Sequence, residues 1–174
     1  MKLTIKLLFI CLLGFLHWFF GNLYDTLILT PNVLLADDQV AMLGIVWRLF
    51  SVSPPYYYYL PWGPLSIGLV VYLWFRLRRT NSVQVRRWIT YATGFAISAG
   101  VVTWYIIVHY NLTLWVGSGQ YSATELSALI RENTVVALFQ IGLVGATVYC
   151  LYRTTRLVVP AYFEARSAVS QSVL

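Results

Sequence analysis

Charged residues are scarce in this sequence. Only 10% of the residues are Asp, Glu, Lys or Arg, whereas a soluble domain has about 25%. Together with 59% hydrophobic residues and a mean hydropathy of +0.70, this deficit excludes an ordinary soluble protein and indicates an integral membrane protein. Four apolar segments with short connections use up the 174 residues, which predicts a single domain over residues 1–174.

Cysteine and recognisable catalytic motifs are also missing. The two cysteines, Cys11 and Cys150, lie in the first and last apolar segments and form no CxxC pair, which excludes a disulfide framework. No Ser-His-Asp arrangement, phosphate-binding loop or nucleotide motif occurs. The net charge of +6 does not indicate nucleic acid, because the basic residues mark the ends of apolar segments. We therefore expect neither a nucleic-acid partner nor a cofactor.

The apolar segments approach the roughly 20 residues that a helix needs to cross a bilayer. They cover residues 7–29, 61–77, 88–110 and 124–152. The first exceeds the usual apolar run of a signal peptide and lacks a cleavage site close behind it, so we expect a retained anchor. The sequence predicts an all-α, antiparallel four-helix bundle whose surroundings are the lipid bilayer.

Basic residues predict the orientation of this bundle. Ten of the twelve fall on one side of the predicted spans, and they are Lys2, Lys6, Arg76, Arg78, Arg79, Arg86, Arg87, Arg153, Arg156 and Arg166. Cytoplasmic loops carry such an excess of Lys and Arg. Both termini are therefore expected in the cytoplasm, and the expected location is a bacterial inner membrane.

The longest connection on the other side runs from Pro31 to Pro55. Asp37 or Asp38 is suited to cap a helix that begins near Gln39. We predict a short extracytoplasmic helix over 39–52 that covers the outer mouth of the bundle, or else packs on the span ends. The following SPPYYYYLPWGP, residues 53–64, is typical of an aromatic belt at the membrane interface, with a ligand entrance as the alternative.

Polar side chains inside the predicted spans are the best indication of a site, because a bilayer penalises them unless protein receives them. The first span contains His17, Asn22 and Asp25. The last span contains three consecutive polar residues at a similar estimated depth, Arg131, Glu132 and Asn133. Gln140 follows near the midplane. The predicted spans place both groups in the outer half of the bundle, where they would meet.

We predict that these groups line an outward-facing pocket for a small hydrophobic ligand. The candidate catalytic residues are His17 as the titratable floor, Asp25 or Glu132 to orient it, and Arg131 to hold an anionic oxygen. The candidate ligand-binding residues are Asn22, Tyr24, His109, Asn133 and Gln140.

Four other interpretations stay open at this point. The polar groups could satisfy one another and only hold the helices in register. A metal site of His17, Asp25 and Glu132 is conceivable, but no ligand spacing supports it and we expect no metal. The small size also suits an accessory subunit that binds other membrane subunits. A proton or ion transporter is a weaker alternative, because inverted halves and broken helices are not evident.

Two short stretches carry a family resemblance. The first span leaves the membrane through Thr30-Pro31-Asn32, and the last opens on a charged stretch with Arg131 and Asn133. In these two regions the chain resembles small four-span membrane proteins of the anthrone-oxygenase-like family. Family members tend to place Trp, Asn and Arg in that order at the last span, whereas Arg131 precedes Asn133 here and no Trp is near. The resemblance implies cofactor-free oxygenation of a polycyclic phenol, with His and Arg handling an enolate.

Overall fold

The computed structural model describes residues 2–43, 61–116 and 118–171, and these residues are mainly helical, with no strand among them. Two of the long helices contain a turn of π-helix. The first rod is α1 (Lys2–Tyr24), η1 (Asp25–Leu29) and α2 (Thr30–Leu34). The second is α6 (Val83–Ile106), η2 (Ile107–Asn111) and α7 (Leu112–Val116). The others are α5 (Trp62–Leu77), the 3₁₀ turn η3 (Ser118–Gln120) and α8 (Ala123–Gln171). The prediction of an all-helical chain is confirmed.

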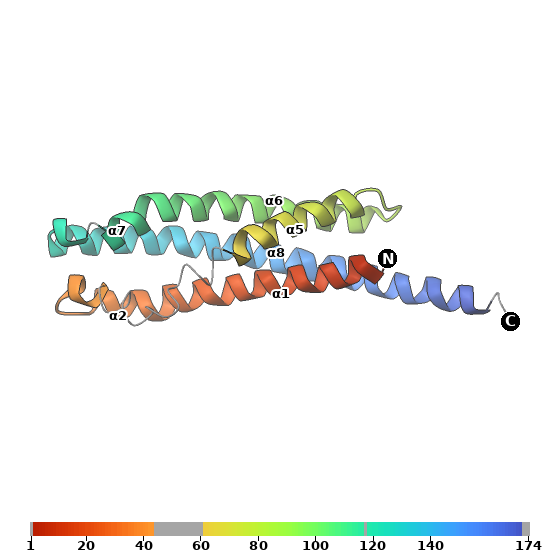
Figure 1. Ribbon diagram of the computed structural model, residues 1–174, viewed down its shortest axis with the longest axis horizontal. Helices are drawn as coiled ribbons and strands as arrows, with labels where there is room; N and C mark the ends of the chain where they lie inside the picture. Colours follow the sequence, from red (N-terminus) through yellow and green to blue (C-terminus); the bar gives the residue numbers. More distant parts are fainter. Residues whose placement is uncertain (1, 44–60, 117, 172–174) are drawn as a thin grey trace.

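The four long elements form an antiparallel ring. α1 packs on α5 and α8, and α6 packs on the same two helices from the other side (Figure 1). Successive helices run in opposite directions, so the N-terminus lies at the same end as the turn between α5 and α6. α8 passes this end and continues beyond the other helices.

The helices differ greatly in length. Among the described residues, three helices are long and apolar enough to cross a membrane, and they cover Lys2–Leu34, Val83–Leu114 and Ala123–Glu164. α5 has only 16 residues, which at the rise of an α-helix is about 24 Å and less than the roughly 30 Å of a bilayer core. α5 begins about halfway along the bundle (Figure 1). Among the described long elements, α1, α5, α6 and α8 form a four-helix half at the N-terminal end, and the α1–α2 rod, the α6–α7 rod and α8 form a three-helix half at the other.

The hydrophobic core is divided accordingly. A large cluster fills the four-helix half, with Leu8, Phe15, Leu73 and Ile89 fully buried in it. A smaller cluster occupies the three-helix half and joins α2, residues 39–43, the η2–α7 segment and the start of α8; its buried members are Val33, Leu43, Tyr110, Leu114, Leu126 and Ile130. The two clusters leave room for a cavity between them.

Small residues bring α5 close to α1. A Cβ on Gly14 would overlap the hydroxyl oxygen of Ser66, and a Cβ on Gly63 would lie 3.8 Å from the Trp18 ring. Gly145 of α8 similarly faces Phe19, whose ring carbon would be 3.2 Å away. Such contacts let helices approach where lipid gives no hydrophobic drive to associate.

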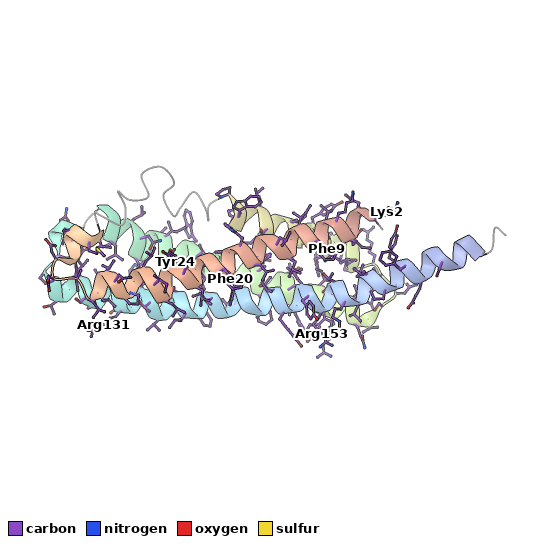
Figure 2. The ribbon with its side chains drawn as sticks, turned by 90° about the horizontal axis from the view of Figure 1, so that it is seen from below. Lys2, Phe9, Phe20, Tyr24, Arg131 and Arg153 are labelled. Carbon is purple, nitrogen blue, oxygen red and sulfur yellow. The ribbon has the colours of Figure 1, made fainter. Side chains whose placement is uncertain are left out.

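The basic end of the bundle carries matched arginine–tyrosine pairs. Arg76 donates to the Tyr72 hydroxyl at 2.8 Å, Arg87 to Tyr91 at 3.1 Å and Arg153 to Tyr149 at 3.2 Å. Each pair is four residues apart on one helix, so the two side chains lie on one face. The Arg153 guanidinium also lies 5.1 Å from the Trp88 ring centroid, which connects α8 to α6. Figure 2 shows Lys2 and Arg153 toward this end and Arg131 at the opposite one.

The connection after α2 is described only in part. Residues 39–43 are helical, and Asp38 caps them by accepting from the Ala41 amide at 2.9 Å. Gln39 joins this segment to α8 through hydrogen bonds with Ser127 of 2.8 and 3.1 Å. The rest of the predicted extracytoplasmic helix, and residues 53–60 of the predicted aromatic belt, lie outside the described residues.

Candidate functional site

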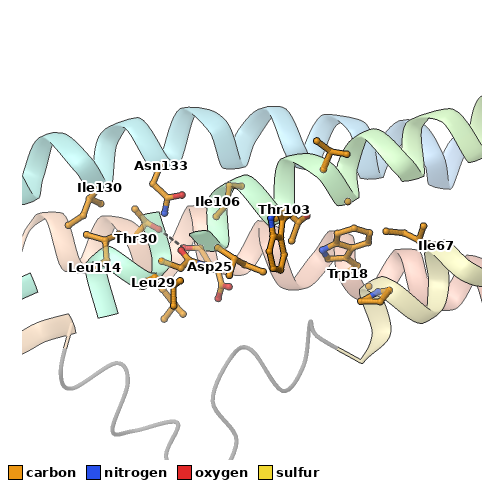
Figure 3. Close-up of a pocket in the computed structure, with 18 of the residues that line it drawn as sticks. Trp18, Asp25, Leu29, Thr30, Ile67, Thr103, Ile106, Leu114, Ile130 and Asn133 are labelled. Carbon is orange, nitrogen blue, oxygen red and sulfur yellow. Dashed lines mark hydrogen bonds between the residues drawn. The ribbon is translucent and has the colours of Figure 1, made fainter. Parts of the chain in front are cut away.

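A cavity of about 1110 Å³ lies between the two hydrophobic clusters, beside the beginning of α5. Its wall is largely apolar and includes Trp18 and Trp104 (Figure 3). Five polar side chains also line the wall, and they come from the α1–α2 rod, the α6–α7 rod and α8: Asp25, Thr30, Thr103, Asn111 and Asn133. Among the described residues of the wall there is no Lys, Arg or His.

The π-helical turn η1 contributes Asp25 and Leu29 to this wall. Its cause is Pro31, which lacks an amide hydrogen and would collide with the carbonyl of Leu27 in a regular α-helix. The wider turn lets the Thr30 amide reach Asp25, five residues back. The Thr30 hydroxyl donates to the same carbonyl at 2.9 Å, and the Asn32 amide group donates to Ile28 at 2.7 Å. The wide turn and two side chains thus satisfy the carbonyls of Asp25 and Ile28, which lie beside the residues that face the proline.

A second π-helical turn, η2, faces the cavity from α6 with Ile107 and Asn111. Here the Leu112 amide reaches the carbonyl of Ile107, again five residues back. No proline accounts for this turn, and nothing in the local sequence explains it. Wide turns of this kind occur frequently at functional sites. Two of them on opposite sides of one cavity indicate that this part of the bundle is built for more than helix packing.

The polar groups of the wall differ in how well they are satisfied. Thr103 receives a hydrogen bond from the buried side chain of Gln140 and donates to the carbonyl of Ala99 at 2.7 Å. This chain of bonds joins α8 to α6. The side-chain oxygen of Asn133, in contrast, is buried and has no hydrogen-bond partner. Buried amide oxygens are normally paired, so the hydrogen-bonding capacity of this acceptor is unused in the structure.

Four of the predicted site residues lie in or near the cavity. Asp25 and Asn133 line it directly. Gln140 stands behind the wall and reaches it through Thr103. Asn22 belongs to the same stripe of α1 as Trp18 and Asp25; it is half-buried and outside the wall, and its side-chain nitrogen is buried without a hydrogen-bond partner.

The other five predicted residues are exposed and do not line the cavity; they are His17, Tyr24, His109, Arg131 and Glu132. The prediction that His17 forms the floor of the pocket is therefore corrected. His17 lies against Trp62, with ring centroids 6.3 Å apart, while its neighbour Trp18 turns into the bundle and is 2% exposed. His109 stacks on Tyr105 at 5.1 Å on the outside of α6.

The expected meeting of His17 with Glu132 and Arg131 fails for two reasons. Successive residues of a helix point about 100° apart, and the stripe that turns inward is the one with Trp18, not the one with His17. The two groups also lie at different levels of the bundle, because Phe19 of α1 lies against Gly145 of α8, thirteen residues beyond Glu132.

Several residues of the wall had no prediction attached to them. Trp18 could have been found, because it continues the stripe of Asn22 and Asp25 at helical spacing. Thr30 precedes Pro31, and a proline within a long apolar helix signals backbone groups that need new partners. Thr103 and Asn111 gave no such signal. Within the described residues, no three of His, Cys, Asp and Glu lie close enough to hold a metal ion.

Comparison of the chain with protein-family models, with curated proteins and with solved structures finds no match. The interpretation of the site therefore depends on its own geometry.

The bond between Gln140 and Thr103 should contribute to stability across the α6–α8 contact. We expect Gln140→Leu and Thr103→Val each to lower the free energy of unfolding by about 1 kcal/mol, because each removes one partner of a bond in the bundle interior. The double variant should show a coupling energy of about 0.6 kcal/mol, typical of hydrogen bonds between membrane helices. Unfolding in detergent micelles measures the cycle.

Thr147→Val is the matched control for this cycle. Thr147 is fully buried on the same helix as Gln140, but its hydroxyl donates only to its own helix, at the Leu143 carbonyl. Its effect should add to that of Gln140→Leu without coupling. Equal coupling in both cycles would show that the Gln140–Thr103 bond has no specific role.

Proposed function

We propose that this chain is an integral membrane protein that binds a small hydrophobic molecule in the cavity between α1, α5, α6 and α8. Its outer surface supports the membrane placement. Large apolar side chains such as Phe9, Phe20 and Val101 are exposed along the helices, in places where a soluble bundle would carry charge (Figure 2). Three helices also have the length and composition of membrane spans.

The basic residues at one end of the helices support one particular depth of the bundle in the membrane. About 20 helical residues cover the roughly 30 Å of a bilayer core. Counted from Lys6, Arg87 and Arg153 at the basic end, that distance reaches Thr26 on α1, Ile107 on α6 and Asn133 on α8. These positions fall at η1, at η2 and at the polar end of the cavity. The proposed membrane therefore has its cytoplasmic face at the arginines and its outer face at the two π-helical turns.

Four crossings with both termini in the cytoplasm follow from this placement, with α5 as the short fourth span. Cysteine labelling tests it. In a variant with Cys11 and Cys150 replaced by alanine, we expect Gly119→Cys, in the turn between α7 and α8, to react with an impermeant maleimide on intact cells. Asn81→Cys, in the turn between α5 and α6, should react only after permeabilisation. Both positions are exposed. Labelling of Asn81→Cys on intact cells would contradict the topology.

The cavity itself carries the ligand proposal. Binding sites for small molecules are mainly apolar hollows of about 300–1,000 Å³ with a few placed polar groups. The observed volume of about 1110 Å³ and the five polar side chains among two tryptophans and many aliphatic residues agree with this description. Proton transfer by His17 is not part of the proposal, because His17 does not face the cavity.

Filling the cavity tests the proposal. Gly68 lies in its wall, and a Cβ built there meets no atom within 4 Å, so Gly68→Phe should enter the cavity without pushing the backbone. We expect this variant to lose at least about 90% of a ligand that the wild-type protein retains through purification, because the new ring takes its place. Extraction and mass spectrometry of the purified protein measure retention.

Gly94→Phe and Gly142→Phe are matched controls. Both glycines are exposed, have equally open surroundings and lie outside the cavity wall. These variants should retain the ligand at the wild-type level. Equal retention in all three variants would contradict binding in this cavity.

A second proposed function, as a subunit of a larger membrane complex, is favoured by the end of α8. This helix continues beyond the other three (Figure 1), and there it exposes Phe163 to the surroundings, with 58% of its surface accessible. The part of α8 that continues past the other described helices thus offers a partner a helix surface that no described neighbour covers.

Native sizing after mild solubilisation checks this. We expect a species larger than a homodimer for the wild type, which Phe163→Glu shifts to lower mass and Glu164→Gln leaves unchanged. A wild-type monomer or homodimer would contradict the subunit proposal.

A further inference from the structure

We infer that the molecule bound in the cavity is a lipid-like amphiphile of the outer leaflet, with a neutral head group that donates hydrogen bonds. In this arrangement the head group lies beside Asn133 and the chain extends toward Trp18. The molecule enters sideways from the bilayer. This inference rests on the proposed ligand-binding function and specifies its ligand class.

The first observation is that the polarity of the wall changes along its length. Asp25, Thr30 and Asn133 gather at the end toward the three-helix half, whereas Trp18 and Ile67 lie at the other (Figure 3). The deeper part of the wall is apolar throughout, with Gly63, Ile67, Ile97, Gly100 and Val101. In the proposed membrane the polar end is level with the outer boundary of the hydrocarbon core. An amphiphile of the outer leaflet has its own polar and apolar parts at the same two depths.

The second observation is the state of Asn133. Its side-chain oxygen is buried and unpaired, and its residue lines the cavity. An amide oxygen accepts hydrogen bonds, so a hydroxyl or amide N–H of the ligand would satisfy it once the Asn133 side chain turns this oxygen toward the cavity. The described wall contains no basic side chain that would pair with an acidic head group. A head group with hydroxyl donors and no negative charge therefore fits better than a carboxylate or phosphate.

The third observation is the direction in which the cavity opens. Three wall residues of α6, Ile97, Val101 and Trp104, are strongly exposed, Trp104 to 69%. Gly68 and Pro64 of α5 line the wall from the other side and are also exposed. This rim belongs to the apolar outer surface of the bundle, which faces lipid chains in the proposed membrane. The opening therefore leads to the leaflet, and an amphiphile can enter without leaving the bilayer.

Brominated probes test the inference, because bromine quenches the fluorescence of nearby tryptophans such as Trp18 and Trp104. The protein in phosphatidylcholine nanodiscs is titrated with 9,10-dibromostearoyl glycerol, with its dimethyl ether, with 9,10-dibromostearic acid and with 9,10-dibromooctadecane. We expect the glycerol ester to bind roughly five- to tenfold more tightly than the other three probes, which is the contribution of about one hydrogen bond. The dimethyl ether tests the donor, since it keeps the oxygens of the head group and replaces each hydroxyl hydrogen by a methyl group.

Variants locate the effect. Asn133→Leu should weaken binding of the glycerol ester by the same factor of roughly five to ten and leave the alkane unchanged. Thr134→Val is the control, because that hydroxyl donates only to the Ile130 carbonyl of its own helix. Gly68→Phe should abolish saturable quenching by all four probes.

The outcomes separate this inference from the function on which it rests. Equal affinity for the ester, its dimethyl ether and the alkane would overturn the inference and leave hydrophobic binding in the cavity intact. Tighter binding of the acid than of the ester would overturn the neutral head group. If no probe gave saturable quenching of the wild type, the proposed binding function would fail together with the inference.

Discussion

The short length of α5 is the constraint on which the rest of this structure depends. Four helices close a ring only as far as α5 extends, and its 16 residues cover about half of the bundle. The cavity lies beside the first turns of α5, where Gly63, Ile67 and Gly68 line it, and among the described residues it continues between α1, α6 and α8 past the beginning of α5. A fourth helix of full length would fill it with side chains and make one continuous core from what are now two clusters.

The two π-helical turns adapt the long helices to this gap. In each turn the amide reaches five residues back, which inserts an extra residue and rotates the helix beyond it. On α1 the change keeps Asp25 in the wall while Val33, further along, packs in the smaller core. Pro31 forces the turn, and the side chains of Thr30 and Asn32 satisfy carbonyls beside it. The π-helical turn that Pro31 causes therefore also places Asp25 in the wall of the cavity.

The sequence predicted the helices well and the site only in part. Long apolar segments ended by basic residues defined the helices, because the length of a helix and the charges at its ends do not depend on how the helix is rotated about its axis. The site required that rotation to be known. In a helix that is apolar on all sides, the pattern does not say whether the stripe of His17 or that of Trp18 turns inward, and the polar histidine drew attention to the wrong one. The glycine-mediated approach of α5, which places Gly63 against Trp18, decides it and is a tertiary contact.

The arginine–tyrosine pairs have a consequence for how the bundle is assembled. In each of three pairs, on α5, α6 and α8, the arginine and the tyrosine belong to the same helix. In the proposed membrane, each of these helices therefore carries its own anchor for the membrane interface and needs no neighbouring helix to form it. A helix inserted alone in the proposed membrane would already settle at its final height. Association of the helices then becomes a search over rotation and tilt, without vertical sliding. The partners that must meet across the bundle, such as Gly14 and Ser66, start level with one another.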